Sequence, residues 1–515
     1  MKNVHLFSSV SRPLLRRFLY SAVFLTVGGC IRVGPVYHAP QAWTPPHYDT
    51  HNQSKGQESP TSKVTETPIS DIWWRQFHDP ELVSLEERIA TQNLSFLLST
   101  ANLAQSRAQM LVAGAERFPT LSAQGSYQRS QHSTEQLREI VRRVGRRIPS
   151  NKGDLLGNSD DVHVPLLNQW QDEIDARYEI DLWGRVAHQY EAAKAVMQMS
   201  EEERRSVLIA QQADMARDYL QLRGDQRRYR ILEQNRATLS QLLDLTTSRY
   251  RSGLVTELDV DSVRARLHDV QAEEESLDQS IAQEMNAIAL LLGAPPQSLN
   301  TELQKTADVP VIPPTVPIGI PSELAHRRPD IREAEARLRE TVAEVGQATA
   351  DFYPKVTITA DFGVQSLSFR DLGWSSRAWD VGPTISLPIF QGGRLYGQLK
   401  LKKAAQKAAA ISYRQTVLQA WNEVDNALQA YHNEQNRQIR LKETVADNQR
   451  ALDLATSQYR SGLSTYLNVL EAQTNLQTSQ LDLTGSDATL ATNLARLYNV
   501  LGGGWKEDLP EKSLH

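Results

Sequence analysis

The sequence contains a single cysteine, which excludes a framework of intrachain disulfides and a zinc site built on paired cysteines. Its 56 basic and 61 acidic side chains leave a net charge of −5, and this balance does not indicate a nucleic-acid partner. Beyond residue 30 we find no run of about 18 apolar residues, the length that a membrane-spanning helix needs. A lipid-spanning role of the mature chain would therefore require a β-barrel.

Catalytic motifs are also lacking. The chain has no phosphate-binding loop, no HExxH pair and no nucleophile elbow, and its 12 histidines do not have the spacing of metal ligands. We therefore expect no enzymatic activity, no catalytic residues, no metal site and no cofactor other than a covalent lipid.

The first 29 residues have the pattern of a signal peptide. Basic residues precede the apolar run 18–27, and Gly28 and Gly29 lead directly into Cys30. This arrangement resembles a bacterial lipobox, which implies that Cys30 becomes a lipid-bearing (palmitate) N-terminus. The alternative is an ordinary export signal with an incidental thiol. Ile31 follows in place of the aspartate that retains such lipoproteins in the inner membrane, which implies an outer-membrane destination.

Residues 30–72 are rich in Pro, Ser, Thr, Gln and His, and such a composition predicts an extended linker that runs over a surface. A second Pro-rich connector covers residues 301–320, and residues 506–515 form a polar C-terminal tail. The chain between these segments divides into two parts, 73–300 and 321–505.

These two parts are copies of one another. The sequence SRYRSGL at 248–254 returns as SQYRSGL at 457–463, which is an offset of 209 residues. Each copy predicts a helix (80–116 and 321–352), two strands, a long helix (187–250 and 397–459), a break at Gly253 or Gly462, and a last helix (256–292 and 465–501). At 1.5 Å per residue, the long helices would span about 95 Å and the last ones about half of that, which indicates a helical cylinder.

Strict alternation of apolar and polar residues predicts the strands, at about 118–131, 169–183, 353–369 and 376–390. In the third strand, for example, Val356, Ile358 and Phe362 alternate with Thr357, Thr359 and Asp361. Segments of about ten residues with one apolar and one polar face are typical of transmembrane barrels. A soluble sandwich is the alternative, but four strands provide no second sheet to cover the apolar faces.

Four strands are too few to close a membrane barrel, since the smallest such barrels have about eight. Two chains would give eight strands and a filled lumen, whereas three would give twelve and room for a pore. We therefore expect a mixed α/β membrane protein: a homotrimer with one shared transmembrane β-barrel, four strands from each chain, continued by a long α-helical barrel.

Several motifs together resemble the TolC-like outer-membrane efflux proteins, in particular lipoproteins of the OprM/NodT type. They are the lipobox with VGPVY at 33–37, WW at 73–74, DLWGR at 181–185, RRPDI at 327–331, LPIF at 387–390, YRSG at 459–462 and LGGGW at 501–505. The resemblance covers nearly the whole chain after residue 30.

The resemblance implies a trimeric exit duct in the Gram-negative outer membrane. It implies partners as well: a periplasmic adaptor (membrane fusion) protein, an inner-membrane transporter of RND type and outer-membrane lipid. The expected function is passive conduction of small toxic compounds or drugs out of the cell. One alternative is the exit duct of a protein-exporting (type I) secretion system, and another is a lipid-anchored periplasmic scaffold of helical hairpins without a pore.

In the resembled family the hairpin tips form the constriction of the pore, and acidic residues behind the tip glycines ring it. By position, Gly253 and Gly462 are the tips and Glu471 forms the tightest ring. Asn468 occupies a second position that is acidic in the resembled family. Asp259 is equivalent to Asn468 in the first copy, and Asp261 lies nearby. Such carboxylates would attract cations and resist closure.

Other roles are open for these residues. Thr256 and Asp259 have the spacing of a helix N-terminal capping motif, and we favour this role over a gate for Asp259. For Glu471 the alternative is a solvated outer face.

An arginine cluster in the long loop at 131–168 would bind the phosphates of lipopolysaccharide, or its side chains would be solvated. Its members are Arg138, Arg142, Arg143, Arg146 and Arg147.

Overall fold

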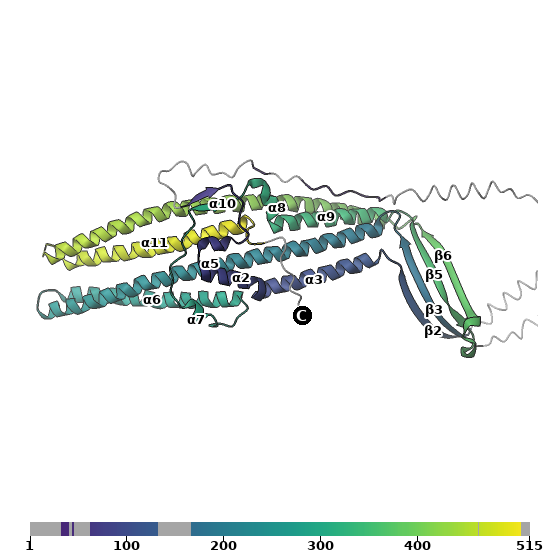
Figure 1. The fold of residues 1–515 in the computed structure, drawn as a ribbon, viewed down its shortest axis with the longest axis horizontal. Coiled ribbons are helices and arrows are strands. Elements are labelled where there is room, and N and C mark those ends of the chain that lie inside the picture. Colours follow the sequence, from purple (N-terminus) through teal and green to yellow (C-terminus); the bar gives the residue numbers. More distant parts are fainter. Residues whose placement is uncertain (1–31, 41–43, 46–61, 132–165, 462, 506–515) are drawn as a thin grey trace, which may run out of the picture. The chain divides into compact units, whose positions relative to one another are not determined.

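The computed structural model describes residues 32–40, 44–45, 62–131, 166–461 and 463–505. The chain divides into two compact units, which we describe separately (Figure 1). Unit 1 contains Met1–Tyr37, Gln109–Ala193 and Glu340–Gln406, and unit 2 contains His38–Ala108, Lys194–Arg339 and Lys407–His515. Residues 1–31, and with them Cys30, lie outside the described part of the chain.

Unit 1 is built around one four-stranded antiparallel sheet, which confirms the four predicted strands. Its strands are β2 (Thr120–Ser130), β3 (Leu167–Ile180), β5 (Lys355–Ser366) and β6 (Arg377–Ser386), in the order β2-β3-β5-β6. Two short 3₁₀ helices, η6 (Phe369–Asp371) and η7 (Trp374–Ser376), connect β5 to β6. The central pair β3–β5 joins the first copy to the second, so the sheet needs both copies.

One face of this sheet is apolar and uncovered. Leu121, Trp379 and Ile385 are 74, 72 and 68% exposed, although each alternates with polar neighbours along its strand. Large apolar side chains in a contiguous exposed patch indicate a surface that another apolar phase or chain covers. The outer strands β2 and β6 each have a single strand neighbour in the described residues, so one edge of each has unpaired backbone groups.

The helices show the duplication directly. Helices α5 (Arg185–Arg251) and α10 (Arg394–Arg460) both have 67 residues, and α6 (Glu257–Leu291) and α11 (Tyr466–Val500) both have 35. Each long helix turns back into its shorter partner to form a hairpin, labelled α5–α6 and α10–α11 in Figure 1. None of the described helices is both long enough and apolar enough to cross a membrane.

The helical stretches predicted at about 80–116 and 321–352 are present, and each is interrupted. In the first copy α2 (Pro80–Gln92) and α3 (Leu94–Ala115) are separated by Asn93, whose side chain caps α3 by accepting from the Phe96 N–H at 2.8 Å. In the second copy η5 (Pro321–Glu323) and α8 (Leu324–Arg327) precede α9 (Pro329–Ala350). Arg328 is extended there because Pro329 disfavours the helical conformation of the residue before it.

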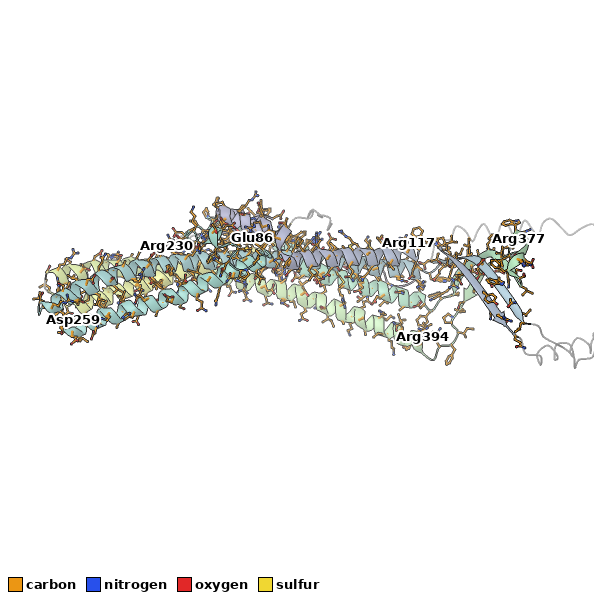
Figure 2. All side chains as sticks on the ribbon, turned by 90° about the horizontal axis from the view of Figure 1, so that it is seen from below. Glu86, Arg117, Arg230, Asp259, Arg377 and Arg394 are labelled. Atoms are coloured by element: carbon orange, nitrogen blue, oxygen red, sulfur yellow. The ribbon has the colours of Figure 1, made fainter. Side chains whose placement is uncertain are left out.

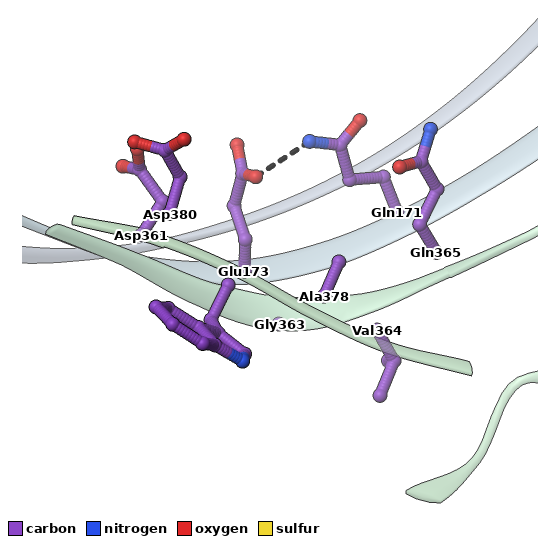
Figure 3. Close-up of a pocket in the computed structure, with 9 residues that line it drawn as sticks. Gln171, Glu173, Asp361, Gly363, Val364, Gln365, Ala378 and Asp380 are labelled. Atoms are coloured by element: carbon purple, nitrogen blue, oxygen red, sulfur yellow. Dashed lines mark hydrogen bonds between the residues drawn. The ribbon is translucent and has the colours of Figure 1, made fainter. Parts of the chain in front are cut away.

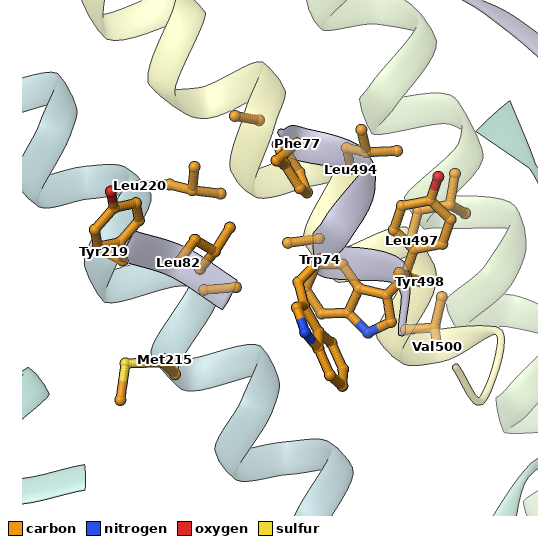
Figure 4. Close-up of a cluster of buried hydrophobic side chains, with 14 of the residues drawn as sticks. Trp74, Phe77, Leu82, Met215, Tyr219, Leu220, Leu494, Leu497, Tyr498 and Val500 are labelled. Carbon is orange, nitrogen blue, oxygen red and sulfur yellow. The ribbon is translucent and has the colours of Figure 1, made fainter. Parts of the chain in front are cut away.

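The core of unit 2 forms where the aromatic segment η2 (Trp73–Phe77) packs against helices of both copies (Figure 4). Trp73 stacks on Tyr498 of α11 with ring centroids 5.4 Å apart, and both are buried. Asp79 then caps α2, since its carboxylate accepts from the N–H groups of Glu81 and Leu82. Tyr219 of α5 donates to the same carboxylate at 2.8 Å, so the aromatic segment ties the two copies together.

The Pro-rich segments also contribute to this core. Strand β1 (Lys63–Thr65) pairs in parallel with β4 (Thr315–Pro317), and the short helix α7 (Asn300–Leu303) precedes β4. Val316 is fully buried and Ile69 is 6% exposed. The described end of segment 30–72 is thus partly buried and not confined to a surface, because it pairs with a connector far along the sequence.

Candidate functional site

The two hairpin turns in unit 2 are closed by equivalent backbone hydrogen bonds. Gly253 adopts φ +70°, a left-handed conformation that glycine reaches without strain, and no other atom lies within 4 Å of a Cβ placed there. The N–H of Leu254 donates to the carbonyl of Arg249 at 2.9 Å, and in the second copy Leu463 donates to Gln458 at 2.9 Å. The prediction for Gly462 stays untested because this residue lies outside the described part of the chain.

Asp259 lies at the start of α6 and acts as a cap (Figure 2). Its carboxylate accepts from the backbone N–H of Thr256 at 2.8 Å and from the Thr256 hydroxyl at 2.7 Å. These bonds satisfy donors at a helix N-terminus, where the helix dipole also favours negative charge. The predicted capping role is confirmed, while a role of Asp259 in a pore stays a prediction.

The other predicted acidic positions have different surroundings. Asp261 is exposed and forms an ion pair with Arg264 on its own helix at 2.6 Å. Asn468 donates to the Ser464 hydroxyl at 2.9 Å. Glu471 is exposed on α11, and no hydrogen bond or ion pair to another described residue engages its carboxylate.

A polar link joins the two hairpins near their tips, and it was not predicted from the sequence. A guanidinium nitrogen of Arg249, near the end of α5, donates to the hydroxyl of Tyr459, near the end of α10, and the guanidinium carbon lies 5.1 Å from the ring centroid. Tyr459 in turn packs edge-on against Tyr466 of α11 with centroids 5.4 Å apart. A signal for this link existed, because Arg249 stands where the second copy has Gln458 in an otherwise nearly identical motif.

Helices α5, α10 and α11 enclose a groove of about 890 Å³ around this link. Its lining is mostly amide and hydroxyl side chains, with Arg249 and Arg460 as cations and Asp453 as the anion. Further along the hairpins Gln473 of α11 bonds to Asn235 of α5 at 3.3 Å, and Arg266 of α6 bonds to Gln477 of α11 at 3.1 Å. Apolar side chains pack across the same interface, since Val263 of α6 clusters with Tyr466 and Val469 of α11. The polar contacts add to this packing, and they can be exchanged at low cost because water competes for them.

The sheet of unit 1 has a polar face opposite its apolar one. Figure 3 shows Gln171, Glu173, Gln365, Asp361 and Asp380 on one side of the strands and Val364 on the other. The register places Asp175, Asp361 and Asp380 directly opposite one another on β3, β5 and β6. A sheet with this division presents water-compatible groups to one side and lipid-compatible groups to the other.

As for Gly462, the predictions of lipid attachment at Cys30 and of an arginine cluster in the 131–168 loop lie outside the described residues. In the part of the chain that the structure describes, no group of three or more His, Cys, Asp or Glu side chains is arranged to hold a metal ion. What the described geometry offers is a two-faced sheet and a pair of hairpins joined by apolar packing and a few polar contacts. The carboxylate of Glu471 on α11 is exposed and has no partner among the described residues.

Comparisons with known proteins agree with this geometry. The family model described as outer membrane efflux protein matches residues 86–294 and 320–503. The antibiotic efflux pump outer membrane protein ArpC of Pseudomonas putida is 30% identical over 93% of this chain and 94% of its own length. The solvent efflux pump outer membrane protein SrpC of Pseudomonas putida is 31% identical over 93% of this chain and 97% of its own.

Among solved structures, the outer-membrane channel OprN superposes with a TM-score of 0.81 at 29% identity and covers 92% of this chain and 99% of its own. The predicted resemblance and fold class are therefore confirmed. The chain belongs to the outer membrane efflux protein family and is an outer-membrane component of an efflux pump.

Proposed function

We propose that three copies of this chain assemble into one passive exit duct for small toxic compounds. The observation that carries this proposal is the four-stranded sheet, which has an uncovered apolar face, a polar opposite face and two incomplete edges. Three such sheets joined edge to edge give twelve strands, enough to enclose a water-filled lumen. Lipid then covers the apolar face, and the polar face lines the passage.

The names of two relatives indicate the kind of cargo. ArpC is named for antibiotic efflux and SrpC for solvent efflux, so we infer that this duct carries small and largely lipophilic molecules. The duct would receive them from a periplasmic adaptor and an inner-membrane transporter of RND type, which couples energy to transport. The chain itself would perform no chemistry, and the lipid on Cys30 would anchor it in the outer membrane.

The constriction of this duct lies at the hairpin tips. By the position that the family resemblance gives Glu471, three copies would bring three of its carboxylates into one ring. No hydrogen bond or ion pair to another described residue engages this side chain. Like charges in a narrow lumen attract cations and repel one another. The ring therefore makes the closed duct cation-selective.

Single-channel recording in planar bilayers tests both parts of this proposal. The purified trimer should show discrete, cation-preferring steps, and Glu471→Ala should lower the cation preference and raise the basal leak. Glu275→Ala, an exposed carboxylate on α6, is the matched control and should change neither. Conductance steps that are identical in Glu471→Ala and wild type would contradict the proposed ring of Glu471 carboxylates. A chain that stays monomeric and shows no conductance would contradict the proposed duct.

A further inference from the structure

The segment that follows Cys30 is held against unit 1 by two backbone contacts. The N–H of Val33 donates to the carbonyl of Trp183 at 3.1 Å, and the carbonyl of Val33 accepts a hydrogen bond from Nε2 of His188 at 2.8 Å. Trp183 is itself fixed, because its indole N–H donates to the carbonyl of Pro354 at 2.9 Å. The first described residues are therefore docked at the start of α5.

Three glycines give this contact its close fit. Gly34 has φ +114°, and a Cβ on it would lie 2.7 Å from Cα of Gly346 in α9. A Cβ on Gly346 would lie 2.3 Å from the imidazole of His188, and one on Gly184 would lie 2.7 Å from Cγ of Arg32. Real Cβ atoms do not approach so closely, so any side chain at these positions would displace the segment or the imidazole.

The hydrogen bonds assign the tautomer of His188. The carbonyl of Val33 can only accept, so Nε2 of His188 carries the proton. Nδ1 is then an acceptor, and a guanidinium nitrogen of Arg32 donates to it at 2.8 Å. Arg32 Nε also lies 3.4 Å from His188 Nε2, but both nitrogens carry protons in this tautomer, so this approach is not a hydrogen bond. Neutral His188 thus bridges the side chain of Arg32 and the backbone of Val33.

The charges around His188 come from three places. Arg32 faces it from the docked segment and also pairs with Glu191, whose carboxylate is 3.9 Å from Nδ1 on the same helix. Asp181 lies at the end of β3 and accepts from the Ala187 N–H at 2.8 Å, while Gly346 of α9 adds no charge. His188 is 2% exposed, and its burial, together with the charge of Arg32, lowers its pKa.

We propose that His188 is the positioning residue of a latch that holds Arg32–Gly34 against the start of α5, and that protonation of His188 opens it. Protonation would place an N–H at Nδ1, where Arg32 now donates, and would set two cations against each other. Since Arg32 lies two residues after Cys30, the latch fixes the point from which the lipid anchor leaves the protein. This last clause rests on the proposed lipidation of Cys30, whereas the latch rests on described residues alone.

The direction of the pH dependence follows from the lowered pKa. The docked state binds fewer protons than the undocked one, so docking is complete above the ordinary histidine value of about 6.5. It weakens as the pH falls below that value. Each unit by which docking lowers the pKa changes the docking equilibrium by up to about tenfold.

Electron paramagnetic resonance on the full trimer in lipid nanodiscs tests the latch. A nitroxide on Val36→Cys reports the mobility of the segment, since Val36 is 75% exposed and takes no part in the contacts described. Mass spectrometry of the mature N-terminus first shows whether Cys30 is acylated. If it is not, the lipid clause fails and the latch is measured in a Cys30→Ser background.

The expected result is a mostly immobilised nitroxide at pH 7.5 that becomes mobile by pH 5, a range above the ordinary titration of carboxyl groups. His188→Gln places an amide where it can donate to Val33 and accept from Arg32, so this variant should stay immobilised at both pH values. His188→Ala should be mobile at both.

The half-buried His432, which bonds only to Asn436 on its own helix among the described residues, supplies the control. His432→Gln should keep the wild-type pH profile. A wild-type profile without pH dependence, or a His188→Gln variant that retains it, would overturn the latch.

Discussion

The two copies of the repeat share their architecture and differ in their chemistry. Their long helices, their short helices and the closing hydrogen bonds of their turns match in length and position. Several polar positions differ: Arg249, Asp259 and Glu284 of the first copy stand where the second has Gln458, Asn468 and Asn493. Both copies therefore form the same helices. Differences at single positions decide which copy supplies a helix cap, a hydrogen bond between the hairpins or an acidic side chain.

The largest effect is expected where the first copy contacts the second. Arg249→Gln makes the two copies alike at this position and removes the charged donor to Tyr459. A hydrogen bond to a charged group contributes about 1.5–3 kcal/mol, and about 1.4 kcal/mol is a tenfold change in an equilibrium. We therefore expect the basal leak of the trimer to rise about tenfold or more in planar-bilayer recordings.

Tyr459→Phe should act in the same direction, because it deletes the acceptor. Tyr250→Phe provides the matched control, since Tyr250 occupies the equivalent position of the first copy and is 43% exposed. An equal leak in Tyr250→Phe and Tyr459→Phe would show that the link between the hairpins is not what closes them.

A smaller effect is expected from a pair of carboxyl groups that only the first copy has. Burial and the neighbouring Asp225 raise the pKa of Glu284 to about 8, whereas the second copy has the uncharged Asn493 at this position. Because the folded pKa lies above the unfolded value, the contribution of Glu284 to stability is full below about pH 4.5 and is lost as the pH rises through 8.

Glu284→Asn introduces the residue that the second copy has at this position, and it removes the contribution of Glu284 to the pH dependence of stability. It should raise the free energy of unfolding at pH 8.5 by about 1–2 kcal/mol relative to wild type. Denaturant unfolding at pH 5.5 and 8.5 measures the difference. A wild-type stability that is the same at both pH values would contradict the raised pKa of Glu284.

The smallest effect concerns the two helix starts at the tips. Asp259→Ala removes the acceptor for both donors of Thr256 and should cost about 1 kcal/mol locally. Asn468→Ala, the matched change in the second copy, breaks only a bond to Ser464 and should cost less. In Asp259→Ala, amide hydrogen exchange should speed up about fivefold at the start of α6. A larger change at the start of α11 in Asn468→Ala would contradict the expectation that the cap of the first copy is the stronger one.

The long helices and the four strands were predictable, because periodicity of 3.6 and of two residues is local and repeats over many positions. The breaks at Asn93 and Arg328 were not, although both residues carry local signals. The Asn93 amide also donates to Gln211 and to the carbonyl of Leu291, and these partners are distant in sequence. The pairing of β1 with β4 escaped prediction for the same reason, since three residues show no periodicity.

The candidate site divides in the same way. The cap formed by Thr256 and Asp259 was readable from a spacing of three residues. The link of Arg249 to Tyr459 and the contact of His188 with Arg32 and Val33 were not, because each joins segments more than 150 residues apart.

The sequence by itself determined the duplication, the period of each element and the positions of the turns, because these depend on neighbours within a few residues. Only the tertiary structure decided which polar side chains meet across the two copies, and which tautomer His188 adopts. These depend on how helices and strands pack, because hydrogen bonds form only between groups within about 3 Å of each other and in suitable directions.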